Sequence, residues 1–146
     1  MQFHLLDDIL ALDGNQITAR KRVTSSEAYL ADHFPGFPIL PGVLMLETLV
    51  QAARHLCEAQ GHGQLVVGQV RAIKYGAMVR PGQALRVEVS VDPADSEGRF
   101  ACRGTGIVEG GTSDGDTAIS GRFTMRPIHV LSATKAATQE PETTCS

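Results

Sequence analysis

His33 and Glu47 are the two residues of this chain whose types and surroundings are best suited to moving protons. His33 lies in a proline-rich loop, and an imidazole suits a base because its ordinary pKa lies near neutral pH. Glu47 is the only charged side chain between His33 and Arg54, within a long apolar segment. Burying a lone carboxyl is costly, and apolar neighbours favour its protonated form, which is the form that an acid needs. Together the two groups are suited to acid–base chemistry such as an elimination of water, in which a base takes a proton from carbon and an acid protonates the leaving hydroxyl.

The start of the apolar segment supplies a third candidate group. Pro41 is expected to be the first helical residue, because its ring is preset for a helix and its missing donor is not needed there. The backbone N–H of Gly42 is then one of the unpaired donors of the first turn, where the helix dipole adds positive charge. Gly42 leaves room for a substrate carbonyl at this N–H. Gln51 follows Glu47 by one helical turn, so we expect it to orient the carboxyl or to bind water beside it.

One long helix and six strands are the elements that must position these groups. Apolar residues recur at helical spacing from Pro41 to about Gln60, and their surface is broad enough to predict a helix that is wrapped by other elements. The expected strands are 3–12, an exposed strand 16–23, a long strand 65–79 with a kink at Gly76, and 85–91, 100–108 and 117–125. A short helix through Leu30 is also expected. This order predicts an α+β fold in which an antiparallel sheet curls around one central helix.

Composition limits the class of protein. With 146 residues, 42% hydrophobic and 20% charged, the sequence predicts one globular domain over 1–130 and a disordered tail over 131–146. A net charge of −3 argues against non-specific nucleic-acid binding, and no segment has membrane-spanning character. The N-terminus has no basic region of a signal peptide, and three scattered cysteines suit a reducing cytoplasm. His55, Cys57 and His62 lack the usual spacing of zinc ligands, so no metal site is expected.

The central segment also resembles a known family. The pattern His33-Phe34-Pro35-Gly36-x-Pro38-x-x-Pro41-Gly42-Val43-Leu44-x-Leu46-Glu47-x-x-x-Gln51 resembles the signature of the β-hydroxyacyl-(acyl carrier protein) dehydratases, in the branch that carries glutamate. Weaker similarity extends over roughly residues 3–126. The resemblance implies the hotdog fold and a homodimer, with a trimer of dimers as a larger assembly. It also implies active sites at the dimer interface, where His33 of one subunit faces Glu47 of the other, and a reaction that needs no metal or organic cofactor.

The resemblance further implies a substrate and its contacts. The substrate is a 3-hydroxyacyl chain on the phosphopantetheine of an acyl carrier protein, and the product is a trans-2-enoyl thioester. Gly42 contacts the thioester carbonyl. Phe37, which stands where a polar residue is usual in the family, and Tyr75 either line an acyl tunnel or pack in the core. The basic residues Arg71, Lys74, Arg80 and Arg86 either dock the carrier or form a solvated face.

Two other functions stay open on the sequence alone. The first is hydrolysis of an acyl thioester by a water molecule that Glu47 activates. The second is a non-catalytic subunit that binds acyl carriers. Release of free thiol without an enoyl product would favour the first, and a site in which His33 is turned away from Glu47 would favour the second.

Overall fold

The computed structural model of the protein describes residues 5–24 and 39–128. The expected short helix through Leu30, the loop with His33 and Phe37, and the tail over 131–146 lie outside these ranges. The described elements are β1 (Asp8–Asp13), β2 (Gln16–Arg22), α2 (Gly42–Ala59), β3 (Leu65–Tyr75), β4 (Ala84–Val91), β5 (Phe100–Glu109) and β6 (Thr117–Pro127). The strands form one antiparallel sheet in the order β1-β2-β4-β5-β6-β3.

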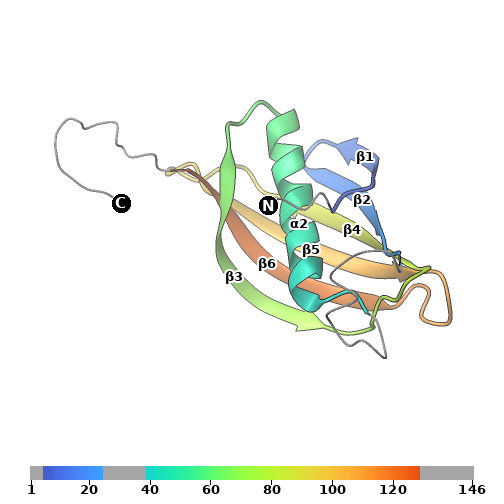
Figure 1. The fold of residues 1–146 in the computed structure, drawn as a ribbon. Helices are drawn as coiled ribbons and strands as arrows, with labels where there is room; N and C mark the ends of the chain where they lie inside the picture. The colour runs from blue at the N-terminus through green and yellow to red at the C-terminus, as the bar shows by residue number, and fades with distance from the viewer. Residues whose placement is uncertain (1–4, 25–38, 129–146) are drawn as a thin grey trace, which may run out of the picture.

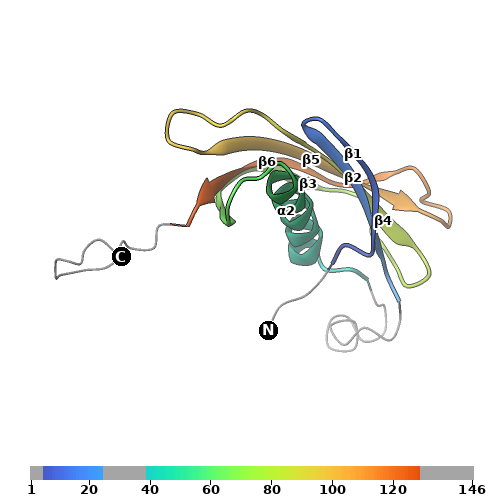
Figure 2. The same cartoon turned by 90° about the horizontal axis from the view of Figure 1, so that it is seen from above.

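The sheet curves around one side of α2, which lies across its concave face (Figures 1 and 2). This is the α+β hotdog arrangement that the sequence predicts, with the two hairpin strands first, the long helix next and four strands after it. The strands β1 and β3 form the two edges of the sheet. β3 follows the helix directly along the chain and pairs with β6 at the edge of the sheet. The end of this edge strand therefore lies near the start of α2.

The core lies between α2 and the sheet. The helix buries Leu49, Val50 and Leu56 among others, and β4 alternates buried and half-buried residues so that Val87 and Val89 face the helix. Apolar residues at three- and four-residue steps therefore do form the buried side of α2. The expectation that the helix is wrapped is met on this side only, because Val43 is 69% exposed and His55 is also exposed. The uncovered side of α2 is thus a surface of the single chain.

The N-terminal hairpin differs from its sequence prediction. Strand β1 begins at Asp8 and is exposed along most of its length, whereas β2 buries Ile17, Ala19 and Lys21. The prediction of an exposed second strand was wrong, because β2 lies between β1 and β4 and turns alternate residues toward the helix. The prediction took the polar residues of β2 as a sign of exposure. The long aliphatic part of a lysine side chain such as Lys21 can nevertheless pack like an apolar residue.

The long third strand also ends earlier than expected, at Tyr75. Gly76 and Ala77 continue to donate backbone hydrogen bonds to the carbonyls of Ala118 and Thr117, at 2.9 Å each. A side chain at Gly76 has no room, because its Cβ would lie 2.5 Å from the Thr117 carbonyl oxygen. The expected kink at Gly76 is therefore the end of the regular strand.

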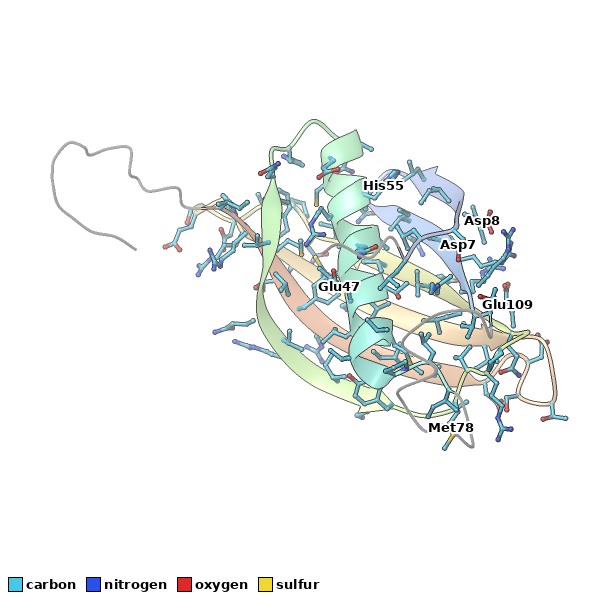
Figure 3. All side chains as sticks on the ribbon, in the orientation of Figure 1. Asp7, Asp8, Glu47, His55, Met78 and Glu109 are labelled. Carbon is cyan, nitrogen blue, oxygen red and sulfur yellow. The ribbon has the colours of Figure 1, made fainter. Side chains whose placement is uncertain are left out.

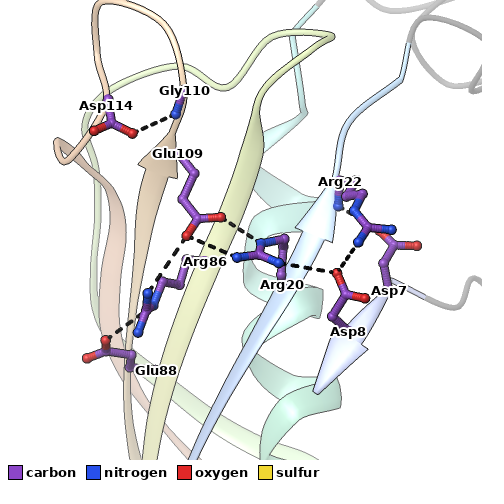
Figure 4. A network of polar contacts seen from close by, with 9 residues as sticks. All are labelled: Asp7, Asp8, Arg20, Arg22, Arg86, Glu88, Glu109, Gly110 and Asp114. Carbon is purple, nitrogen blue, oxygen red and sulfur yellow. Dashed lines mark hydrogen bonds and ion pairs between the residues drawn. The ribbon is translucent and has the colours of Figure 1, made fainter. Parts of the chain in front are cut away.

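Ion pairs fasten the exposed strand β1 to the outer face of the sheet (Figure 4). Asp8 contacts Arg22 at 2.8 Å and Arg20 at 3.5 Å, and Arg20 contacts Glu109 at 2.7 Å. Arg86 lies 3.8 Å from the same Glu109 carboxylate, so it belongs to this network. Glu109 and Asp8 raise the pKa of the Arg20 guanidinium, and the largest cause is the hydrogen bond that Arg20 donates to the Glu109 carboxylate. Of the four basic residues considered for carrier docking, Arg86 therefore has a structural role.

Candidate functional site

The first turn of α2 places the backbone N–H of Gly42 at the start of the helix. Pro41 has φ −62° and ψ 145°, an extended conformation, so it is the N-cap and Gly42 is the first helical residue. The prediction that Pro41 is the first helical residue was therefore off by one position. Leu44 and Met45 make the first bonds of the helix, both to the Pro41 carbonyl, at 3.0 and 3.1 Å. The N–H of Gly42 precedes these donors and belongs to the unpaired group that a helix start presents.

Tyr75 lies directly against Gly42. A Cβ built on Gly42 would lie 2.8 Å from Cε1 of the Tyr75 ring, so the ring rests on the bare glycine backbone. Tyr75 ends β3 and its side chain is 54% exposed, which makes it a surface residue of the single chain rather than a core residue. The fold thus brings together two of the residues that the sequence singled out, one from the helix start and one from the edge strand.

Replacing Gly42 with alanine tests this contact. We expect kcat/KM for the elimination that the sequence predicts to fall by about 10- to 100-fold, because the new methyl group would displace the Tyr75 ring from the place where the sequence predicts a substrate contact. Stability should change little, since alanine is a good helix former. Tyr75→Ala should cause a similar loss, and the double variant should lose little more, because the two residues act through one contact. Losses that multiply in the double variant, measured by steady-state kinetics, would contradict this account.

Glu47 is held by a chain of two hydrogen bonds. It is half-buried on α2, and Nε2 of Gln51 donates to its Oε2 at 3.3 Å. Oε1 of Gln51 accepts a hydrogen bond from the backbone N–H of Leu5 at 2.9 Å. The expected proximity of Gln51 and Glu47 therefore exists in the structure. The expected burial of Glu47 among apolar neighbours is only partial, because Glu47 is half-buried and the nearby Val43 is 69% exposed.

The Leu5 contact is the part of the site that sequence reasoning missed. The donor is a backbone N–H that lies 46 residues away from Gln51 in the chain. A backbone group carries no signal in the residue type, so no pattern in the sequence points to it. His33 and Phe37 lie outside the described residues, and their places in the site stay predictions. Glu47 itself lies partway along α2, among the labelled side chains of Figure 3.

The cysteines of the described ranges do not join the site. Cys57 and Cys102 are free and buried. Burial raises the pKa of the Cys57 thiol, and burial together with the charge of Cys57 raises the pKa of Cys102 to about 12. A protonated thiol is a poor nucleophile, so neither cysteine suits covalent chemistry at neutral pH.

Over residues 5–24 and 39–128, no cluster of three histidine, cysteine or acidic side chains could hold a metal ion. In the same part of the chain, no helix combines the length and apolar character needed to span a membrane.

Comparison with known proteins gives the family. The family model described as ApeI-like, ApeI dehydratase, matches residues 10–114. A 3-hydroxyacyl-[acyl-carrier-protein] dehydratase FabZ from Roseiflexus castenholzii is 36% identical over 133 residues, which cover 88% of this chain and 87% of that protein.

Solved structures give the same fold. The dehydratase heterocomplex ApeI:P from Xenorhabdus doucetiae matches with a TM-score of 0.59 and 19% identity, over 81% of this chain and 91% of that chain. The protein smu.793 from Streptococcus mutans, bound to acetyl CoA, matches with a TM-score of 0.65 and 14% identity, over 86% of this chain and 90% of that chain. At these identities the structural matches show the fold alone. The match of the family model and the identity to the FabZ protein go further, and by them the chain belongs to the ApeI-like family of dehydratases.

Proposed function

We propose that this dehydratase converts a (3R)-3-hydroxyacyl thioester, carried by an acyl carrier protein, to the trans-2-enoyl thioester and water. The observation that carries the proposal is the geometry of α2. A glycine N–H begins the helix, and a carboxyl further along it is oriented by the amide of Gln51. An oxyanion donor and a positioned acid are two of the three groups that such an elimination needs. His33 is proposed as the third group, the base.

In the proposed reaction His33 takes the proton from the carbon next to the thioester carbonyl. The electron pair forms the double bond as the bond from the third carbon to its hydroxyl breaks. The proton of the Glu47 carboxyl goes to the departing hydroxyl, which leaves as water. The N–H of Gly42 stabilises the negative charge that develops on the thioester oxygen. Proton transfer from the His33 imidazolium to the Glu47 carboxylate restores both groups, so the reaction is acid–base chemistry throughout and needs no cofactor.

Assays with purified protein and 3-hydroxyacyl thioesters of graded chain length test this function. We expect an enoyl thioester to form with its characteristic ultraviolet absorbance, and the reverse hydration of crotonyl thioester to be catalysed as well. Chain-length preference should appear as a change in KM. Release of free thiol without an enoyl product would show a thioesterase instead, and binding of acyl carrier without turnover would show a non-catalytic subunit.

The substrate carrier and the location are parts of the same proposal. The name of the FabZ relative states that it acts on substrates linked to acyl carrier protein, and we extend that substrate to this chain. A cytoplasmic location follows, supported by the two buried reduced thiols. Phe37 and Tyr75 are proposed to contact the acyl chain, which agrees with the exposure of Tyr75 beside Gly42.

The proposed assembly is a homodimer joined through β3, with a trimer of dimers as the larger form. β3 is an edge strand, and its end adjoins the exposed apolar residues Val43, Tyr75 and Met78. The contact of Tyr75 with Gly42 and the bond from the Leu40 N–H to the Val79 carbonyl place these three residues around the helix start. A partner subunit that pairs with β3 would cover this patch and complete the site.

A matched pair of edge-strand variants tests the dimer. Val70 on β3 is 42% exposed and Leu10 on β1 is 40% exposed, so aspartate at either position is equally accessible in the single chain. We expect Val70→Asp to give a monomer without dehydratase activity, because paired edges would bring two carboxylates together. Leu10→Asp should remain a dimer with normal turnover. Light scattering coupled to size exclusion measures this, and a dimeric, active Val70→Asp variant would refute the β3 interface.

A further inference from the structure

The side-chain amide of Gln51 can adopt only one orientation in this site. A backbone N–H is always a donor, so the Gln51 atom that contacts the Leu5 N–H at 2.9 Å must be the oxygen. The nitrogen therefore faces Glu47 and donates to Oε2 at 3.3 Å. The Leu5 contact thus fixes which way the Gln51 amide points.

This orientation has a consequence for Glu47. An oxygen that accepts a hydrogen bond from an amide N–H cannot at the same time point an acid proton of its own toward that N–H. In a protonated carboxyl the carbonyl oxygen is the better acceptor, so the donor from Gln51 favours Oε2 as the carbonyl oxygen, and Oε2 still accepts from Gln51 after the proton has left. Within the described ranges no donor reaches Oε1. The transferable proton therefore belongs on Oε1.

We propose that the backbone amide of Leu5 acts through Gln51 as a positioning device that assigns the acid proton of Glu47 to Oε1. This inference rests on the proposed function, because it describes how Glu47 is prepared as the acid. Gln51 and Leu5 are positioning residues and do not need to touch the substrate. The donor on Oε2 also stabilises the carboxylate that forms when the proton leaves, since hydrogen bonds to charged groups are stronger than those to neutral ones.

The N-terminal segment is built to hold the Leu5 amide in place. The Leu5 side chain is 2% exposed, so the residue is anchored by burial. Two residues later the N–H of Asp7 donates to the Arg20 carbonyl at 2.8 Å, which fixes the chain beside β2. The segment before β1 therefore reaches from the edge of the sheet to the middle of α2, and it contributes to the site through its backbone.

Three variants separate the amide of Leu5 from its side chain. Leu5→Pro removes the N–H, Leu5→Ala keeps the N–H and removes most of the buried side chain, and Gln51→Met removes both hydrogen-bonding groups at similar size. We expect Gln51→Met to lower kcat by about 10- to 100-fold, the effect of losing a hydrogen bond to a charged group. Leu5→Pro should lower kcat in the same direction, because the Gln51 amide is then no longer held in one orientation. Their KM should stay close to the wild-type value, because neither residue is proposed to touch the substrate.

Leu5→Ala should lower the thermal unfolding midpoint and lose less kcat than Leu5→Pro, because it keeps the backbone N–H. If Leu5→Pro does not fold, Gln51→Met alone decides the matter. A Gln51→Met variant with the wild-type kcat would overturn the inference, as would equal losses of kcat in Leu5→Pro and Leu5→Ala. These outcomes differ from failure of the proposed function, because in that case the wild-type protein itself would not dehydrate the substrate.

Discussion

The Glu47→Gln variant should bind substrate with a near-normal KM and lose about 10²- to 10⁴-fold in kcat, the usual contribution of a positioned general acid. Glutamine has nearly the same size and shape as glutamate, but its amide cannot release a proton to the leaving hydroxyl. Its side-chain oxygen can still accept the hydrogen bond from Nε2 of Gln51, so the local structure should persist. The loss should therefore fall on the chemical step, which single-turnover kinetics separates from binding.

Glu58→Gln is the matched control for this variant. Glu58 lies on the same helix and is exposed. Its substitution by glutamine makes the same chemical change, from a carboxylate to an amide. We expect it to keep wild-type turnover and stability, since exposed substitutions away from special contacts have small effects. Unchanged kinetics in Glu47→Gln would reduce Glu47 to a structural residue, and equal losses in both variants would point to a general effect on the helix.

Removing the imidazole of His33 should have a comparable effect. His33→Ala is expected to slow hydration of crotonyl thioester by at least about 10²-fold, because no other group is proposed to exchange the proton on carbon. His55→Ala is the control, since His55 is exposed on the helix away from the buried face (Figure 3). The measurement is the steady-state change in enoyl absorbance, in the hydration direction and in the dehydration direction. Near-normal turnover in His33→Ala, or equal loss in His55→Ala, would remove His33 from the mechanism.

The sequence predicted the fold well where the pattern is strong. The helix over Gly42–Ala59 and the order of the strands follow from apolar residues at helical spacing and from alternation, as in β4. The errors occur where side-chain letters conflict with position in the sheet. Lys21 is polar by type but buried by the neighbours of β2, and only the pairing of strands reveals it. Pro41 stands one residue outside the helix, a detail that depends on its ψ angle rather than on its ring.

The site was predictable only in part, for the same reason. Glu47 and Gln51 are one helical turn apart, so their contact is local and the helical spacing predicts it. The contact of Tyr75 with Gly42 joins residues from a strand end and a helix start, and nothing in their spacing states it. The role of the Leu5 backbone amide cannot be predicted from the residue type, because nearly every residue has a backbone N–H. Long-range contacts of this kind come from the way the sheet curves around α2.

Mixing two inactive variants measures most directly whether His33 and Glu47 meet across a subunit boundary. His33→Ala and Glu47→Gln subunits are unfolded together, refolded as a mixture and assayed against each variant alone. A shared site predicts recovery to about a quarter of wild-type activity, because half of randomly paired dimers are mixed and each mixed dimer keeps one intact site of two. If the two residues belong to one chain, every site lacks one of them and the mixture stays as inactive as its parts, which would contradict the account.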